Sequence, residues 1–325
     1  MRSLAPLALF YAAIKGLHRY VGLRGGVKNR DSLLPFIVIG AMRAGGSGKT
    51  SVTLELTRQL SARGHRVGIL AYWIQKPCEK QRGGIQPYSS DLAEVTSEAD
   101  WRFCSDEAVL LARVSGARVF VARNREKAWE CLSRLGAFDL LISDDGLMDP
   151  RLQGSFRIVL RRPGEFPGLL DLLPAGPYRM TADILDKADC VVEGPLLTPE
   201  TGKYWFQRKL IFPVGFNPHR EHWILCGLGN PEAFRQELLS AGVSIKGMSR
   251  GPDHGLPNLH KARIQAAKES ATTFICTAKD WVKLGNRTAE LGPERGAVVV
   301  VGEQIELDPN LFSVIEKYLK SWVSS

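Results

Sequence analysis

The hydrophobic and polar positions along this 325-residue chain form short apolar runs separated by longer amphipathic stretches. The amphipathic stretches predict helices that begin near Thr50, Ser105 and Asn124. The runs rich in branched and aromatic residues predict strands at Phe36–Ile39, Arg66–Ala71, Arg118–Val121, Phe138–Ile142, Phe156–Leu160 and Cys190–Val192. Because strands and helices alternate, we expect an α/β fold with a parallel sheet covered by helices.

A segment with two prolines and a glycine, PVGFNPHREH at residues 213–222, interrupts this alternation and is typical of a boundary. After it, the pattern predicts strands at Trp223–Cys226, Thr273–Thr277 and Ala297–Val301 and a final helix near Leu311–Val323. We therefore expect three parts: an N-terminal helix over 1–30, a core lobe over 31–215 and a smaller α/β lobe over 216–325.

The N-terminal segment has a helical pattern with one apolar face, made of Leu4, Leu7, Tyr11, Ile14, Leu17 and Val21. Its apolar run, residues 4–14, is shorter than the roughly 20 residues that cross a bilayer. With nearby lysine and arginine, the pattern favours a helix lying in a membrane interface. A packed helix and a signal peptide are the alternatives, although no small-x-small cleavage site follows the run.

Composition and charge narrow the class of protein. With 44% hydrophobic and 24% charged residues, the chain is typical of a globular protein. Residues 1–30 carry six of the nine net positive charges and no acidic residue, and the rest is nearly balanced. We therefore expect an anionic membrane surface as partner and no nucleic acid. The six cysteines form no CxxC pair, which argues against a zinc site and a disulfide framework and favours thiols in a reducing cytoplasm.

The stretch GAMRAGGSGKTS, residues 40–51, follows the first predicted strand and opens a helix. Glycines let successive backbone N–H groups turn toward a phosphate at a helix N-terminus. The expected nucleotide-binding residues are Gly45, Gly46, Ser47, Gly48, Lys49, Thr50 and Ser51. Lys49 would reach the outer phosphates and the Thr50 hydroxyl would bind Mg²⁺. Arg43 stands where the strict pattern has glycine, and it could face the phosphates or solvent.

A second motif, which is acidic, fits the same nucleotide-binding chemistry. FDLLISDDGL, residues 138–147, is an apolar strand that ends in Asp144 and Asp145. Acidic residues at the carboxyl end of such a strand face the metal in phosphate-loop enzymes, so we expect both as Mg²⁺ ligands. An acidic turn without a ligand is the alternative.

Several further stretches, taken with these two, resemble the tetraacyldisaccharide 4'-kinase family, the lipid A kinases of Gram-negative bacteria. The family pattern runs through GGTGKTP, GDEP, DDGLQH, LLPAGPLRE, GxGNPxxF, a PDHH-like segment and TxKDxVKL. This chain has, in the same order, GGSGKTS, SDEA (105–108), DDGLMD (144–149), LLPAGPYRM (172–180), GLGNPEAF (227–234), GPDHG (251–255) and TAKDWVKL (277–284).

The resemblance implies a P-loop core lobe with a smaller second lobe. It also implies transfer of the γ-phosphate of ATP to the 4'-hydroxyl of a tetraacylated glucosamine disaccharide 1-phosphate. The catalytic residues it implies are Lys49 with Asp106 and His254, the last two drawing the proton from the acceptor hydroxyl. It further implies a peripheral or monotopic protein at the cytoplasmic face of the inner membrane, and we expect a monomer. Lys279 and Asp280 would have a minor nucleotide or structural role, or form an exposed ion pair.

The chain departs from the family pattern near the expected site. The family's SRGYG segment is replaced by AYWIQKP (71–77), DDGLQH by DDGLMD, and the proline of GDEP by Ala108. Tyr72 and Trp73 could line an altered acceptor pocket or belong to the core. The alternative functions are a related membrane-associated ATPase or kinase with a different acceptor, and a nucleotide-binding pseudoenzyme.

Overall fold

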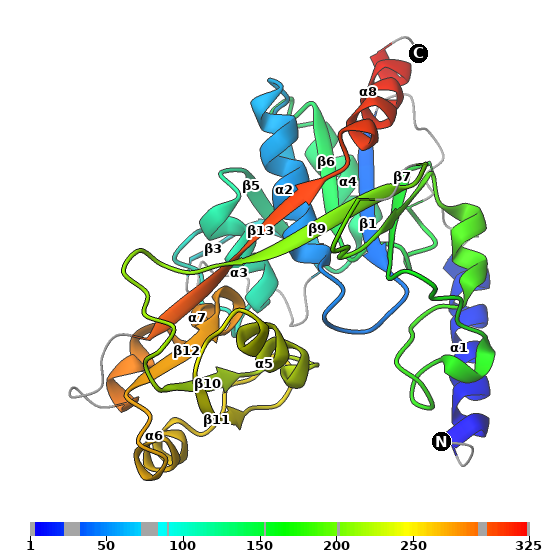
Figure 1. Ribbon diagram of the computed structural model, residues 1–325. Coiled ribbons are helices and arrows are strands. Elements are labelled where there is room, and N and C mark those ends of the chain that lie inside the picture. The colour runs from blue at the N-terminus through cyan, green and yellow to red at the C-terminus, as the bar shows by residue number, and fades with distance from the viewer. Residues whose placement is uncertain are drawn as a thin grey trace. The chain divides into compact units, whose positions relative to one another are not determined.

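The computed structural model describes residues 4–22, 33–72, 84–89, 91–152, 154–199, 202–291 and 298–323. The chain divides into two compact units (Figure 1). The first comprises residues 1–208 and 305–325, and the second comprises residues 209–304. The chain passes from one unit to the other within strand β9 (Tyr204–Ile211) and returns within β13 (Val299–Leu307).

The first unit is built on a mostly parallel sheet in the order β9-β8-β7-β1-β6-β2-β5-β4-β3. Its parallel strands are β1 (Phe36–Ala41), β2 (Val67–Tyr72), β5 (Arg118–Ala122), β6 (Leu140–Asp144), β7 (Phe156–Arg161) and β8 (Cys190–Glu193). Each of the six strands expected in this part is present, and the α/β prediction is confirmed. The edge strand β3 (Ile85–Ser89) and its neighbour β4 (Leu92–Val95), which pair antiparallel, were not expected.

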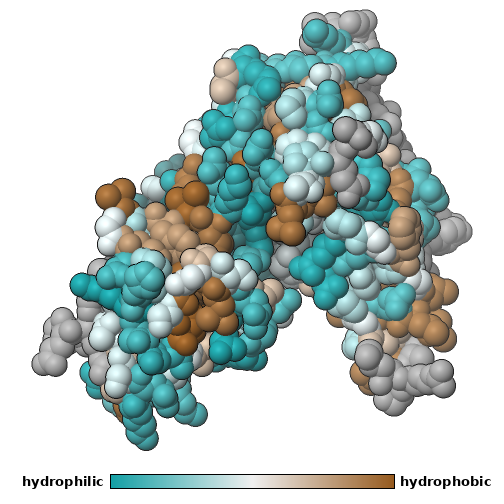
Figure 2. All heavy atoms as spheres, viewed as in Figure 1, coloured by the Kyte–Doolittle hydropathy of each residue, from teal (hydrophilic) through white to brown (hydrophobic). Residues whose placement is uncertain are grey.

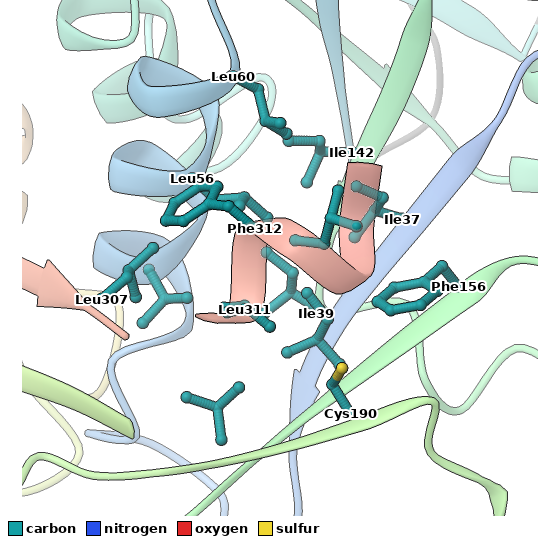
Figure 3. Close-up of a cluster of buried hydrophobic side chains, with 14 of the residues drawn as sticks. Ile37, Ile39, Leu56, Leu60, Ile142, Phe156, Cys190, Leu307, Leu311 and Phe312 are labelled. Carbon is teal, nitrogen blue, oxygen red and sulfur yellow. The ribbon is translucent and has the colours of Figure 1, made fainter. Parts of the chain in front are cut away.

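Helices cover both faces of this sheet because the strand side chains alternate. Ile37 and Ile39 of β1 face a core closed by α2 (Lys49–Ala62) and α8 (Pro309–Val323) (Figure 3). Phe36 and Val38, which alternate with them along β1, face a second core that includes Trp129 of α4 (Arg125–Ser133). The helix α3 (Asp106–Val114) also packs on the sheet beside β5.

Helix α8 belongs to the first unit, whereas the sequence-based boundary placed all of residues 216–325 in the second lobe. Leu311, Phe312 and Ile315 are buried in the core of the first unit, against α2 and β1. The amphipathic pattern predicts the helix but does not say which apolar surface receives it.

The helix α1 (Ala5–Gly22) lies in the first unit and packs against the short 3-10 helix η3 (Leu169–Asp171). Ala8 is fully buried, whereas Leu7 and Phe10 are 51% and 65% exposed. A further 3-10 helix, η4 (Ala182–Lys187), precedes β8. Among the described residues, no helix has both the length and the apolar character needed to cross a membrane.

The second unit is a smaller parallel sheet in the order β11-β10-β12-β13, with β10 (His222–Cys226), β11 (Ile245–Arg250) and β12 (Thr273–Thr277). Its helices are α5 (Pro231–Ser240), α6 (Leu259–Lys268), α7 (Ala278–Leu284) and the 3-10 helix η5 (Gly285–Leu291). Apolar clusters on both faces of the sheet give this unit its own core. The loops that follow β10 and β11 carry the GLGNP and GPDHG motifs.

Candidate active site

The glycine-rich stretch forms a loop between β1 and α2, at the carboxyl end of the central strand. Gly45, Gly46 and Gly48 have φ of 67°, 61° and 77°, in the left-handed region that favours glycine. Helix α2 begins directly after Gly48, at Lys49. The N-terminus of α2 therefore presents backbone N–H groups and the positive end of the helix dipole beside the loop, an arrangement suited to phosphate.

The Lys49 ammonium lies between the loop and the end of β6. Its Nζ donates to Ser47 Oγ at 3.3 Å and lies 4.0 Å from Asp145 Oδ2. The Lys49 side chain is 13% exposed, so little water screens its charge. This cation can neutralise phosphate charge at the head of α2.

Thr50 and Asp144 come together because β1 and β6 are parallel neighbours, with Ile39 opposite Asp144. Thr50 Oγ1 donates to Asp144 Oδ2 at 3.0 Å, and Thr53 Oγ1 lies 3.5 Å from Asp144 Oδ1. Asp144 is 5% exposed. A hydroxyl and a carboxylate side by side form a hard oxygen donor set that fits Mg²⁺.

Asp145 occupies the turn after β6 with φ of 61°, and its N–H donates to the Ile39 carbonyl at 3.0 Å. Its Oδ2 accepts a 2.6 Å hydrogen bond from Arg179 Nη1. Burial acts to raise the pKa of the Asp145 carboxyl, but the charges of Lys49, Arg179 and Arg125 outweigh it and the pKa is lowered. Asp145 is therefore ionised and paired with cations.

Arg125, the first residue of α4, supports this turn from inside the protein. Its Nη2 donates to the Asp144 carbonyl at 3.2 Å and to the Asp145 carbonyl at 3.0 Å. The side chain is buried, and this desolvation lowers the pKa of Arg125. Sequence reasoning missed Arg125 because no motif marks it, and it missed the pairing of Arg179 although Arg179 lies in the quoted LLPAGPYRM stretch.

Arg43, in the loop after β1, forms an ion pair within the first unit. Its Nη1 pairs with Glu165 Oε1 at 3.3 Å, and its guanidinium lies 5.6 Å from the centre of the Tyr178 ring. Tyr178 Oη also donates to Glu165, at 3.1 Å. Two backbone hydrogen bonds run alongside, from Ala44 N–H to Pro177 O and from Arg179 N–H to Met42 O. The LLPAGPYRM segment thus supports the phosphate loop.

The residues expected for proton transfer lie in different units. Asp106 is the first residue of α3 in the first unit, 2% exposed, after the N-cap Ser105. His254 lies in the GPDHG loop of the second unit with φ of 59°, and its Nε2 is 3.8 Å from Asp253 Oδ2. Asp280 is not part of an exposed ion pair with Lys279, because it is buried and pairs with Lys283.

The departures from the family pattern have partial structural explanations. Tyr72 is 51% exposed, and its ring lies 5.2 Å from the Arg125 guanidinium, so it is not a core residue. Trp73 and the rest of AYWIQKP lie outside the described residues. Asp149, at the histidine position of DDGLQH, accepts from Arg151 Nη2 at 2.7 Å. The altered aspartate is thus part of a local ion pair.

The site has the features of a phosphate-loop nucleotide-binding protein. A glycine loop joins a strand to a helix that begins with Lys49 and Thr50, and Asp144 ends the neighbouring parallel strand. A family model described as Tetraacyldisaccharide-1-P 4'-kinase (LpxK) matches residues 1–320. The chain therefore belongs to the tetraacyldisaccharide 4'-kinase family, as its motifs indicated, and it is a kinase.

Individual relatives agree with the family match. The tetraacyldisaccharide 4'-kinase of Delftia acidovorans is 31% identical over 98% of this chain and 91% of its own length. That of Aeromonas hydrophila subsp. hydrophila is 37% identical over 77% of this chain and 74% of its own length. The fold is similar to a crystal structure of the "apo" form of LpxK from Aquifex aeolicus in complex with ATP. The TM-score is 0.66 at 24% identity, covering 98% of this chain and 99% of that chain.

Proposed function

We propose that this chain transfers the γ-phosphate of ATP to the 4'-hydroxyl of a tetraacylated glucosamine disaccharide 1-phosphate in lipid A biosynthesis. The observation that carries the proposal is the grouping of Lys49, Thr50 and Asp144 at the head of α2. The identity of the acceptor is taken from the family model, which matches residues 1–320.

In this proposal, each element of the phosphate loop has a separate role. The backbone N–H groups of residues 45–51 hold the phosphates, and the Lys49 ammonium offsets the charge that develops during transfer. Mg²⁺ would neutralise the phosphate oxygens, and Thr50 and Asp144 would be its protein ligands. Asp145, the second expected metal ligand, pairs with Arg179 and lies 4.0 Å from Lys49 Nζ, and it would hold these two cations beside the phosphates.

We further propose that Asp106 and His254 remove the proton from the acceptor hydroxyl. A carboxylate orients an imidazole and raises its basicity, and the imidazole assists the attacking oxygen. Asp106 is the first residue of α3, directly after the N-cap Ser105, and His254 lies in the GPDHG loop with a φ of 59°. These assignments come from the motif match and from the chemistry of the two groups.

We propose that α1 and the segment around η3 rest on the inner membrane at its cytoplasmic face. Large apolar side chains are exposed on both elements, and brown, hydrophobic spheres gather over this region in Figure 2. They are Leu7, Leu9, Phe10 and Ile14 on α1 and Phe166, Leu169 and Leu170 on or before η3. Such a surface, with the basic charges of residues 1–30, suits anionic lipid and would bring the acylated acceptor to the site.

The test is transfer of labelled γ-phosphate from ATP to the tetraacylated disaccharide 1-phosphate in detergent micelles. Lys49→Ala should lower transfer by about 100-fold or more, because the site loses its main phosphate cation. Lys127→Ala, an exposed lysine on α4, is the matched control and should match wild type. Equal transfer by Lys49→Ala and wild type would contradict the phosphate-loop assignment. ATP binding without transfer would favour another acceptor or a pseudoenzyme.

A further inference from the structure

The second unit contains a buried ion pair that the transfer reaction as described does not use. Lys283 Nζ lies 2.9 Å from Asp280 Oδ1, and the two side chains are 0% and 1% exposed. Both residues belong to α7, the helix of the TAKDWVKL motif. The second carboxylate oxygen, Asp280 Oδ2, accepts from the Thr277 hydroxyl at 2.9 Å. Burying two charges has a large desolvation cost, so the contacts that this pair makes with the surrounding backbone are informative.

The pair holds the peptide groups on both sides of Gly227, the residue that follows β10. The Gly227 N–H donates to Asp280 Oδ1 at 3.0 Å, and its carbonyl accepts from Lys283 Nζ at 3.2 Å. Charge-assisted hydrogen bonds of this kind are stronger and more directional than neutral ones. The direction of the Gly227 carbonyl is therefore fixed by α7.

The same carbonyl holds the backbone of His254. The His254 N–H donates to Gly227 O at 3.2 Å, so this oxygen accepts from both His254 and Lys283. His254 has φ of 59°, a strained conformation for a residue with a side chain. The two loops also meet closely, since a Cβ at Gly227 would overlap the Gly255 carbonyl oxygen. The His254 conformation thus depends on a tightly constrained backbone contact.

We infer that Asp280 and Lys283 are positioning residues for phosphate transfer, which act by fixing the Gly227 carbonyl and through it the His254 backbone. The inference rests on the proposed role of His254 as part of the proton-transfer pair. Displacing a catalytic group by about 1 Å can cost on the order of 100-fold in rate. Loss of the pair should therefore lower kcat and leave ATP binding, which uses the first unit, nearly unchanged.

The test is a double-mutant cycle on kcat in the full-length protein. Lys283→Met and the neutral double variant Asp280→Asn/Lys283→Met are each measured with His254 and with His254→Ala. The double variant avoids an unpaired buried charge and so tests the inference if Lys283→Met alone folds poorly. Lys268→Met, exposed at the end of α6, is the matched lysine control, and Val282→Ala, buried in α7, is the control for lost stability.

We expect both Lys283 variants to lower kcat by about 10- to 100-fold with His254 present. In the His254→Ala background the same changes should lower it less than about 2-fold, because the group they position is gone. The KM for ATP should change less than about 3-fold, and both controls should keep kcat near wild type. Equal losses in both backgrounds, or an unchanged kcat in the folded double variant, would overturn the inference alone. A wild-type kcat for His254→Ala would overturn the role of His254 together with the inference.

Discussion

Individual residues of the candidate site balance charge: the buried Asp144 and the partly exposed Asp145 are surrounded by cations. Asp144 and Asp145 end β6, and Lys49, Arg125 and Arg179 approach them from three different elements. The motifs predicted Lys49, Thr50 and both aspartates because a strand, a glycine-rich turn with GKT and an apolar strand ending in two aspartates can be recognised in the sequence. They could not predict Arg125 and Arg179, since those contacts depend on how α4 and the 172–180 segment fold back on the sheet.

Asp149 stands where the family motif has histidine, and the stability contributed by its ion pair with Arg151 can be tested by varying the pH. Burial acts to raise the pKa of the Asp149 carboxyl, but hydrogen bonds and charge from Arg151 outweigh it and lower the pKa. A carboxyl whose pKa is lower in the folded state stabilises the protein fully at pH values above its pKa in the unfolded state, roughly 3.9. This stabilisation is lost as the pH falls through its pKa in the folded state. Asp149→Asn should therefore destabilise the protein at pH 7 by about 2 kcal/mol, less so toward pH 3.

Thermal unfolding of wild type and Asp149→Asn across pH 7 to 3 measures this difference. Asp183→Asn, which removes an exposed partner of Lys187, is the control and should change stability by less than about 1 kcal/mol throughout. A gap between wild type and Asp149→Asn that is as large at pH 3 as at pH 7 would show that charge is not its cause.

At the scale of elements, buried parallel strands were the most predictable part of the fold. Their runs of branched apolar residues are long enough to stand out, as at Phe36–Ala41. The β3–β4 hairpin was missed because four of the five residues of β3 are exposed and give no apolar pattern. The contact between α1 and η3 was also missed, since residues 166–171 are a short turn-rich stretch without a helical period.

The proposed membrane surface gives a prediction for these two elements. Phe10 and Leu170 are 65% and 60% exposed, and each would bury apolar area in lipid. The Phe10→Glu/Leu170→Glu variant should bind vesicles containing phosphatidylglycerol about 10-fold or more weakly, because it loses that burial and adds repulsion from anionic lipid. Vesicle co-sedimentation measures the binding. Leu197→Glu, at a 99% exposed leucine elsewhere in the first unit, should bind like wild type; equal loss there would mean that added charge alone weakens binding.

At the scale of the whole molecule, the chain leaves the first unit in β9 and returns to it in β13, so that α8 closes the core begun by β1. Sequence periodicity placed a helix near Leu311–Val323 but assigned it to the second lobe, because pairing of distant apolar surfaces leaves no local signal. The family resemblance, in contrast, was readable throughout, since most of its motifs lie in loops or at the first turn of a helix, where function constrains each residue type.

Transfer of phosphate to the 4'-hydroxyl can be tested by removing that hydroxyl from the acceptor. The wild-type protein is given labelled ATP with the tetraacylated disaccharide 1-phosphate or with its 4'-deoxy analogue, and labelled lipid and free phosphate are both measured. We predict labelled lipid from the first acceptor alone, with little free phosphate from either, because the acceptor oxygen is the attacking group. Labelled lipid from the 4'-deoxy analogue, or abundant free phosphate without labelled lipid from the tetraacylated disaccharide 1-phosphate, would contradict this function.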